Sequence, residues 1–434
     1  MNKNVKELFE FINAAPTSYN AVSAISARLE MLGAVRLSES EVWNIECGKT
    51  YYVTRNMSSV IMFNVPESGY GPFKIIASHC DSPIFKLKDN FETISADAVR
   101  LDTERYGGMI MSSWFDRPLS IAGRVVIDSG SKVETKIVDL KKPVLVIPNM
   151  PIHFNRNVND GYTYNAQTDM MPIAGSKNAK GRIAELIAKK ADADIGDIIG
   201  YDLFVYCAEK STVTGVDDEY LLSPRLDDLE CAFSSLKAFE NTENAGGIQL
   251  CCIFDNEEVG SGTKQGADSS FLSDTIDRIT LSLGKNTEDK CRALASSFML
   301  SADNAHAVHP NHTDKYDTEN RTYMNGGVVI KYNANQKYTT DGISAAIFRK
   351  ICNKAGVPCQ SFANRSDIVG GSTLGNISNS HVSVNTVDIG LAQLAMHSAV
   401  ETAGSKDLDY MISAMTEFYN SEIISADDGT YLVK

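Results

Sequence analysis

The sequence predicts an α/β protein with a largely parallel sheet covered by helices on both faces, and a second, β-rich domain. Strands alternate with helices from about residue 220 onward, short strands follow two N-terminal helices, and the stretch between these regions is rich in strands. The length of 434 residues is sufficient for two domains, at roughly 100–200 residues each. We therefore expect an α/β domain formed by residues 1–90 and 219–434, with a β-rich domain inserted at residues 91–218.

The N-terminal elements follow from the spacing of apolar residues. Apolar residues at helical spacing predict two helices within the first 35 residues, the second ending before Gly33. Apolar runs then predict short strands at residues 60–64 and 73–77. The second run is followed at once by the polar residues of Ser-His-Cys-Asp at 78–81.

The middle of the chain has a different character from about residue 90. The runs at residues 122–127 and 132–138 flank Asp-Ser-Gly-Ser and predict a hairpin. Residues 143–148 predict a further strand, and residues 180–191 an amphipathic helix.

The remaining elements restore the alternation of strands and helices. Strands are expected at residues 248–254, 296–301, 328–332 and 383–389. Helices are expected at residues 229–240, 342–355 and 407–419.

Composition excludes several classes of function. The formal charge of −14 disfavours binding to nucleic acid or to anionic membranes, and no apolar stretch approaches the roughly 18 residues of a membrane span. The first helix carries Glu7 and Glu10, so it is not a signal peptide. The nine cysteines are odd in number and form no C-x-x-C, which predicts a reduced cytoplasmic protein without a thiolate zinc site.

Metal-binding residue types follow the ends of predicted strands. They are His79 and Asp81 after residues 73–77, Glu257 and Glu258 after residues 248–254, and Asp303 after residues 296–301. Ligands of open α/β sheets collect outside the carboxyl ends of the strands. Because carboxylates near apolar strand ends are costly to bury unless they are paired or bind metal, this pattern indicates a site.

Two of these motifs have plain chemical interpretations, each with a simpler alternative. In His79-x-Asp81, the imidazole can bind metal while the carboxylate holds the ring, although a turn with a surface Asp has the same residues. In Glu257-Glu258, adjacent acids point in different directions, so one can bind metal while the other takes a proton from water. A solvated acidic loop is the alternative there.

The other candidates are weaker when taken singly. Asp227-Asp228 precedes a helix and is suited to capping it, and the apolar surroundings of His397 are typical of a buried core histidine. The loop at residues 301–311 contains Asp303 and two histidines, more than a neutral loop needs. As a set, these residues suit two metal ions that each take one His and one carboxylate and share a third, bridging carboxylate.

Several long blocks occur in order along the chain: ASHCDSP, SSWFDRPLSIAGRV, SPRLDDLECAF, FDNEEVGSGTKQGA, SADNAHAVHPNH and LAQLAMHSAVETAG. With these blocks, the sequence closely resembles the aspartyl aminopeptidase family of dinuclear zinc exopeptidases over essentially its whole length. The resemblance implies a zinc-exopeptidase-like α/β catalytic domain with an inserted β-rich dimerisation domain. It also implies two divalent metal ions per subunit, most commonly Zn.

The resemblance assigns ligand roles to five residues. His79 and Asp303 match the terminal ligands of one ion, and Glu258 and His397 those of the other. Asp227 matches the bridging ligand, and the peptide bond after it is expected to be cis.

The resemblance also assigns the reaction, which is removal of the N-terminal residue of a peptide by a water that the two metals activate. Glu257 matches the general base that deprotonates this water and later protonates the leaving amine. Asp81 matches the carboxylate that supports His79.

Four residues are candidates for contact with the substrate. Lys331 matches a lysine that faces the side chain to be removed and would favour Asp or Glu, although an edge-strand lysine is the alternative. Gly371 would place backbone N–H groups near the substrate or form a plain turn, and His306 is a candidate contact to substrate or oxyanion. His153, in the inserted segment, matches a histidine that approaches a neighbour's active site; otherwise it is a surface residue.

The implied partners are peptides with a free N-terminus and further copies of the chain, assembled from dimers into the family's dodecamer. The chain departs from the animal-type pattern at Asp228, where Asn is commoner, and at residues 366–370. The second departure leaves a broad preference for neutral residues as the alternative to Asp or Glu. An idle assembly or cargo scaffold is disfavoured because the chain has Glu257 as well as five ligand residues. A carboxypeptidase or deacylase is disfavoured because the match continues through the inserted segment.

Overall fold

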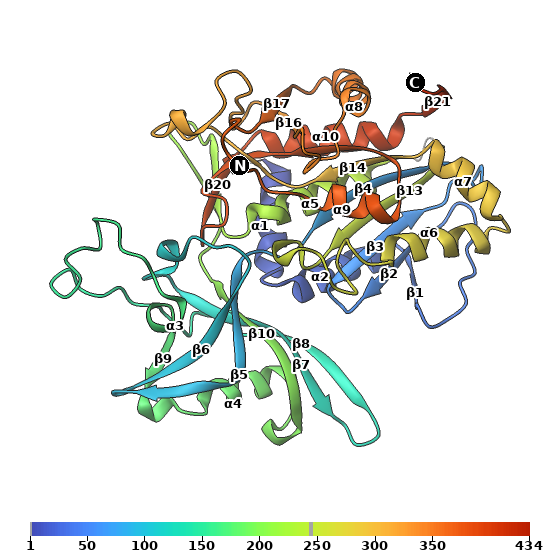
Figure 1. Cartoon of the computed structure of the whole chain (residues 1–434). Helices are drawn as coiled ribbons and strands as arrows, with labels where there is room; N and C mark the ends of the chain where they lie inside the picture. Colours follow the sequence, from blue (N-terminus) through green and yellow to red (C-terminus); the bar gives the residue numbers. More distant parts are fainter. Residues whose placement is uncertain (1, 243–245) are drawn as a thin grey trace.

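The structure is a computed structural model that describes residues 2–242 and 246–434. Within these residues, nine strands form one mixed sheet in the order β1-β2-β3-β13-β4-β14-β18-β16-β17 (Figure 1). In this order, their bounds are Val35–Leu37, Thr50–Arg55, Ser59–Asn64, Ile248–Phe254, Phe73–His79, Phe298–Ala302, Asn385–Gly390, Val328–Tyr332 and Cys359–Ala363.

The centre of this sheet is parallel and its flanks are mixed. Strands β13, β4, β14 and β18 run parallel to one another. Strand β3 is antiparallel to both β2 and β13, and β16 is antiparallel to β18. The carboxyl ends of the four central strands therefore meet at one edge of the sheet.

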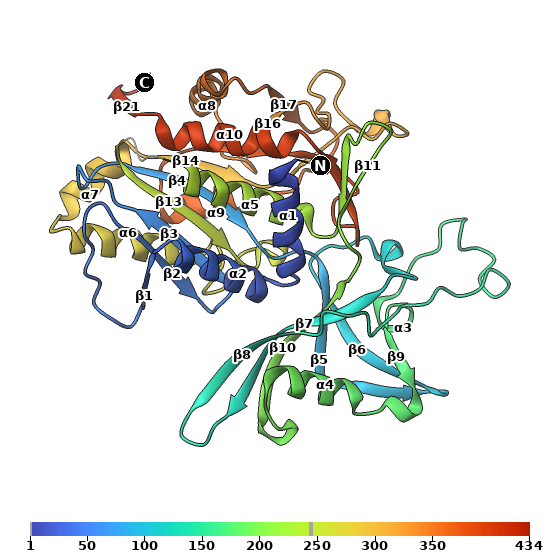
Figure 2. The ribbon, with the colours of Figure 1, turned by 180° about the vertical axis from the view of Figure 1, so that it is seen from behind.

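Helices cover both faces of the sheet (Figures 1 and 2). On β13, Cys251 and Ile253 face one core while Leu250 and Cys252 face the other, because side chains alternate along a strand. The first core includes α1 (Lys3–Ala14), α2 (Ser18–Met31), α5 (Leu226–Asn241), α8 (Gly342–Ala355) and α10 (Asp407–Asn420). The second includes α6 (Phe271–Ser282), α7 (Thr287–Ala295) and α9 (Leu374–His381).

A second sheet lies below the first in Figures 1 and 2. Six of the described strands form it in the order β8-β7-β10-β5-β6-β9. In this order, their bounds are Val133–Asp139, Leu119–Asp128, Ile198–Cys207, Ile84–Ser95, Ala98–Tyr106 and Ile173–Ser176. Its separate apolar core includes Ile183 and Ile187 of α4 (Arg182–Ala191), while the short α3 (Ala166–Asp169) contacts β6.

The rest of the chain contains a smaller sheet and a C-terminal hairpin. Five described strands pair in the order β11 (Thr212–Thr214), β12 (Tyr220–Ser223), β20 (Glu401–Gly404), β19 (Ala392–Leu394) and β15 (Ala305–His306). Strands β21 (Ile423–Asp427) and β22 (Thr430–Val433) form the hairpin. A search of the described residues finds no helix with the length and apolar character of a membrane span.

Many elements lie where the sequence predicts them. Strands β13 and β16 and helix α8 have the predicted bounds, and β7 and β8 form the predicted hairpin. The predicted strand at residues 143–148 is wrong, because in the described structure these residues form only isolated bridges, from Leu145 and Val146. Pro143 and Pro148 lack the N–H groups that would extend a ladder from those bridges.

Candidate metal centre

The centre lies at the edge where the central parallel strands end. Strand β4 ends at His79, and Asp303 follows β14 directly. Glu257 and Glu258 begin a short 3-10 helix, Glu257–Val259, three residues after the end of β13. Three neighbouring strands of one sheet thus deliver these four side chains to the same edge.

Asp227 comes from the beginning of α5. Arg225 has a left-handed backbone conformation with φ of 56°, and the Asp227–Asp228 peptide bond is cis, as the resemblance implies. Asp227 and Asp228 have non-helical backbone angles, so regular helix begins only after them, and among the described hydrogen bonds neither carboxylate accepts from an N–H group of α5. Instead, Asp228 Oδ2 accepts a hydrogen bond of 3.1 Å from the backbone N–H of His79.

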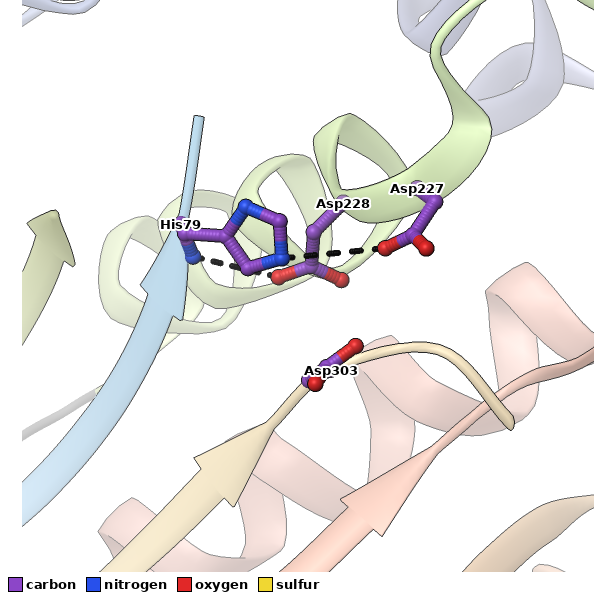
Figure 3. Close-up of side chains that lie close together, drawn as sticks. All are labelled: His79, Asp227, Asp228 and Asp303. Carbon is purple, nitrogen blue, oxygen red and sulfur yellow. Dashed lines mark hydrogen bonds and ion pairs between the residues drawn. The ribbon is translucent and has the colours of Figure 1, made fainter. Parts of the chain in front are cut away.

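One group of potential ligands forms around His79 (Figure 3). Its members are His79, Asp227, Asp228 and Asp303, whose ligand atoms all lie within 4.8 Å of one another. His79 Nε2 lies 3.7 Å from Asp227 Oδ1, and in the view of Figure 3 Asp228 lies between these two residues while Asp303 lies below them.

A second group shares Asp227 with the first. It contains Asp227, Glu258 and His397. His397 Nε2 lies 3.4 Å from Asp227 Oδ2 and 3.4 Å from Glu258 Oε1. The two oxygens of Asp227 therefore face different histidines, as a bridging carboxylate requires.

The carboxylates of these groups are buried with too few donors. Asp227 Oδ1, Asp228 Oδ1 and Glu258 Oε1 accept no hydrogen bond from any described residue. Burial raises the pKa of Glu258 well above its usual value, with the charge of Asp227 adding to the effect. Buried anions without donors are costly, so the imidazole and carboxylate ligands of this site fit divalent cations such as zinc.

Asp81 organises the backbone next to these groups. Its Oδ1 lies 3.4 Å from His79 Nδ1 and accepts a 3.1 Å hydrogen bond from the N–H of Glu257, while Oδ2 accepts one of 3.2 Å from the N–H of Glu258. Burial raises the pKa of the Glu257 carboxyl to about 8; among nearby charges, His79 opposes this shift and Asp303 adds to it.

Lys331 lies beside the first group in the interior of the protein. Its Nζ donates to the carbonyl of Asn304 at 2.9 Å and lies 3.6 Å from Asp303 Oδ2. Burial disfavours its charge, but the carboxylate of Asp303 holds the pKa of Lys331 above its usual range. The edge-strand alternative is wrong, because β16 lies between β18 and β17.

The remaining predicted residues are divided between two places. His306 and Gly371 line one cavity of about 290 Å³, which Lys315 and Arg365 also line. His153 is exposed in the loop between β8 and α3, which projects away from the body of the molecule (Figure 1), so it does not join the metal-binding groups of this chain.

Glu401 is a site residue that sequence reasoning missed. It is buried at the start of β20, where its two carboxylate oxygens accept hydrogen bonds from the N–H groups of Asp227 at 3.0 Å and His397 at 2.7 Å. The signal available in the sequence was its position four residues after His397 within a matching block. Glu401 thus binds the backbone of both Asp227 and His397, two members of the second group.

The comparison with protein families decides which family the chain belongs to. A family model described as "Aminopeptidase I zinc metalloprotease (M18)" matches residues 11–419. The chain belongs to the M18 family. As an M18 protein, it is a zinc-dependent metallo-aminopeptidase that hydrolyses peptide bonds, in agreement with the expected enzyme class.

Individual M18 relatives match nearly the whole chain. The chain is 45% identical to the probable M18 family aminopeptidase 2 of Clostridium novyi, over 96% of this chain and 99% of the relative. It is 39% identical to the protein of the same name from Ectopseudomonas mendocina, over 96% of this chain and 98% of the relative.

Solved M18 structures agree in fold. The chain resembles a chain of the cryo-EM structure of the Ape4 and Nbr1 complex, with a TM-score of 0.93 and 35% identity over 96% of this chain and 85% of that one. It resembles the S. cerevisiae mApe1 dodecamer with a TM-score of 0.84 and 26% identity over 96% of both chains.

Proposed function

We propose that this chain removes N-terminal residues from peptides at a centre of two divalent ions, with Asp227 as the shared ligand. The observation that carries the proposal is that Asp227 Oδ1 faces His79 while Asp227 Oδ2 faces His397. Asp303 would complete one ion site beside His79, and Glu258 the other beside His397.

Glu257 is suited to move protons at this centre. Zinc held by these residues would supply a Lewis acid for the scissile carbonyl and would lower the pKa of a bound water. The backbone N–H of Glu257 donates a hydrogen bond to Asp81, and Glu257 is adjacent to the proposed ligand Glu258. Its carboxylate is therefore near the ligands, although it belongs to neither group of potential ligands. It would accept the proton of the water and return it to the leaving amine.

We propose a preference for acidic N-terminal residues, with a broad preference for neutral residues as the alternative. Lys331 supports the acidic preference because its fixed, buried charge lies next to Asp303. Lys315 and Arg365 line the cavity of His306 and Gly371 together with Asp317, and Arg365 is paired with Asp367 at 2.6 Å, so the buried charge of Lys331 carries the argument. A substrate carboxylate gains most from such charges where water is excluded.

The test is hydrolysis of the p-nitroanilides of Asp, Glu, Leu and Lys by wild type and by Lys331→Met. We expect the wild type to favour Asp or Glu, and the variant to lose at least about tenfold in kcat/KM for these substrates relative to Leu. Lys74→Met is the matched control, because Lys74 is also buried and donates to a backbone carbonyl, that of Tyr419, at 2.7 Å. Its substrate ranking should equal that of the wild type.

The outcomes separate the hypotheses. A wild type that hydrolyses the Leu substrate best would keep the metal chemistry and refute the acidic preference. A folded, zinc-loaded protein that hydrolyses none of the substrates would favour the idle scaffold instead. Zinc content is measured for each variant, because Lys331 also contacts the proposed ligand Asp303.

We propose that residues 91–218 form an inserted dimerisation domain within a catalytic domain of residues 1–90 and 219–434, with strand β5 of the inserted sheet beginning slightly earlier, at Ile84, and that dimers assemble into a dodecamer. Exposed Met150, Ile152 and Phe154 on the loop next to His153 support this, since apolar side chains clustered on a projecting loop are typical of contact surfaces. The solved structure of S. cerevisiae mApe1 is that of a dodecamer. The nine free cysteines support a cytoplasmic location.

Light scattering after size exclusion tests this assembly. We expect a twelve-chain species for the wild type and smaller species for Phe154→Asp. If His153 acts in a neighbouring site, His153→Ala lowers kcat/KM in the assembled enzyme but has no further effect in the Phe154→Asp background. A monomeric wild type, or an equal effect of His153→Ala in both backgrounds, would contradict the proposal.

A further inference from the structure

The segment from Tyr106 to Gly108 connects the six-stranded sheet to the metal-binding groups. Tyr106 is the last residue of β6, in the sheet below the centre (Figure 1). Its hydroxyl donates to Asp81 Oδ2 at 2.7 Å and accepts from Asn256 Nδ2 at 2.8 Å. A residue of the second sheet thus reaches the carboxylate on which the backbone of Glu257 and Glu258 depends.

The direction of these hydrogen bonds is determined by the surroundings of Asn256. Its Oδ1 accepts from Thr263 Oγ1 at 2.8 Å and from Gln265 Nε2 at 2.6 Å. The amide nitrogen of Asn256 must therefore face Tyr106, and it can only donate. The Tyr106 hydroxyl consequently gives its own proton to Asp81.

Asp81 transmits this contact to three residues of the proposed site. It accepts the N–H groups of Glu257 and Glu258, one on each oxygen, and its Oδ1 lies 3.4 Å from His79 Nδ1, whose hydrogen bond of 3.1 Å is with the backbone carbonyl of Asp81. A rotation of this carboxylate would alter both backbone hydrogen bonds and its distance from the His79 ring. The Tyr106 hydroxyl, which donates to Oδ2, restrains that rotation.

The two glycines after Tyr106 contact the other half of the site. Gly107 has φ of 75°, and a Cβ at this position would lie 3.1 Å from Glu258 Cβ. The carbonyl of Gly108 lies 2.6 Å from His397 Nδ1, and the N–H of Ile110 donates to the carbonyl of His397 at 2.9 Å. An acceptor at Nδ1 places the ring proton there and leaves Nε2 free to bind metal.

We propose that Tyr106, Gly107 and Gly108 form a positioning segment that orients Asp81 and His397, and that metal retention and turnover therefore depend on the six-stranded sheet. This inference rests on the proposed function, since it assumes that His79, Glu258 and His397 bind metal. Tyr106 touches no proposed reacting atom and acts through Asp81. Contacts of this type typically change metal affinity or activity about 10–100-fold.

Tyr106→Phe isolates the hydroxyl. The variant keeps the ring, which packs edge-on against Phe204 at 5.8 Å between centroids. Tyr206→Phe is the matched control, because Tyr206 lies in the same sheet and its hydroxyl also donates to a buried carboxylate, Asp139 Oδ1, at 2.8 Å. Both variants lose a buried hydrogen bond to an Asp, so their thermal stabilities should fall by similar amounts.

Two readouts distinguish positioning from stability. For Tyr106→Phe, we expect kcat to fall at least about tenfold with KM nearly unchanged, and zinc to be released to a chromogenic chelator at least about tenfold faster. Tyr206→Phe should match the wild type in both. Equal kcat and equal zinc release for the two variants would overturn the inference.

Asn256→Asp provides a second, nearly isosteric variant. Its carboxylate keeps an acceptor for Thr263 and Gln265 but presents a second oxygen to Tyr106, which would draw the hydroxyl proton away from Asp81. We expect a loss similar to that of Tyr106→Phe, and a double variant no worse than either single variant. Additive losses would contradict the shared route through the hydroxyl.

The zinc readout separates this inference from the proposed function. If the wild type lacks aminopeptidase activity but Tyr106→Phe still releases zinc faster than Tyr206→Phe, the proposed function fails and the positioning role stands. If the wild type is active and both variants retain zinc and turnover equally, the proposed function stands and the positioning role fails.

Discussion

Replacement of Glu257 by Gln tests the assignment of the general base most directly. The two side chains have nearly the same shape, and the backbone N–H that Glu257 donates to Asp81 is unchanged. Glu257 is also absent from both groups of potential ligands. The substitution should therefore remove a proton acceptor while leaving the metal-binding residues in place.

The expected loss follows from the role of the side chain. A positioned general base contributes about 10²–10⁴-fold to the rate, which corresponds to about 3–5.5 kcal/mol of activation free energy. Glu257 is half-buried, and this burial, with the charges of nearby carboxylates such as Asp303 adding to it, raises the pKa of Glu257 to about 8. Bound cations would lower that pKa again, so at neutral pH the loaded enzyme would keep the basic form that Gln cannot supply.

The assay measures kcat on the best p-nitroanilide substrate together with zinc content by mass spectrometry. Glu417→Gln is the control, since Glu417 forms its 2.8 Å ion pair with Lys354 on the surface of α8 and α10. We expect Glu257→Gln to keep wild-type zinc content and lose at least about 100-fold in kcat. Activity within about threefold of wild type, or loss of zinc, would refute the reasoning.

Three further predictions concern metal and stability. Removal of zinc by a chelator should abolish activity, and the thermal midpoint of the metal-free protein should fall as pH rises from about 5 to 8. Burial raises the pKa of both Glu257 and Glu401 to about 8, so in this range the folded state holds protons that the unfolded chain has lost. A pH-independent midpoint would contradict this prediction. Burial lowers the pKa of Lys74 to about 8, so between pH 8 and about 10 the unfolded chain binds a proton that the folded state has lost, and the contribution of Lys74 to stability should grow with pH. In Lys74→Met, the thermal midpoint should depend less on pH in that range. Asp341→Ala removes the capping box of α8 and should lower the free energy of unfolding in urea by about 1 kcal/mol without changing kcat. A fall in kcat would show that α8 does more than support the sheet.

The sequence was informative where local pattern and chemistry coincide. Strand β13 and helix α8 have periodic apolar residues and clear ends, so their bounds followed from pattern alone. The ligand candidates were visible because His79 and Asp303 directly follow buried strands, and polar residues there need a reason. The strand expected at residues 143–148 was wrong because its apolar residues pack into the core of the six-stranded sheet without forming a hydrogen-bonded strand ladder.

The sequence missed contacts that depend on partners far along the chain. Glu401 looked like an ordinary acid, and its role became visible only through the backbone N–H groups of Asp227 and His397. Tyr106 lies 25 residues from Asp81 and 150 from Asn256, and no local pattern connects these three side chains.

By itself, the sequence determined the chemical inventory of this protein: the alternating elements, the acids and histidines at strand ends, and the ordered blocks that place it among zinc aminopeptidases. The tertiary structure decided how that inventory is arranged. It directed the two oxygens of Asp227 to different histidines and placed Tyr106 of a second sheet against Asp81. The reason is physical: residue type and spacing act locally, whereas a metal centre depends on directions and distances that only the packed chain defines.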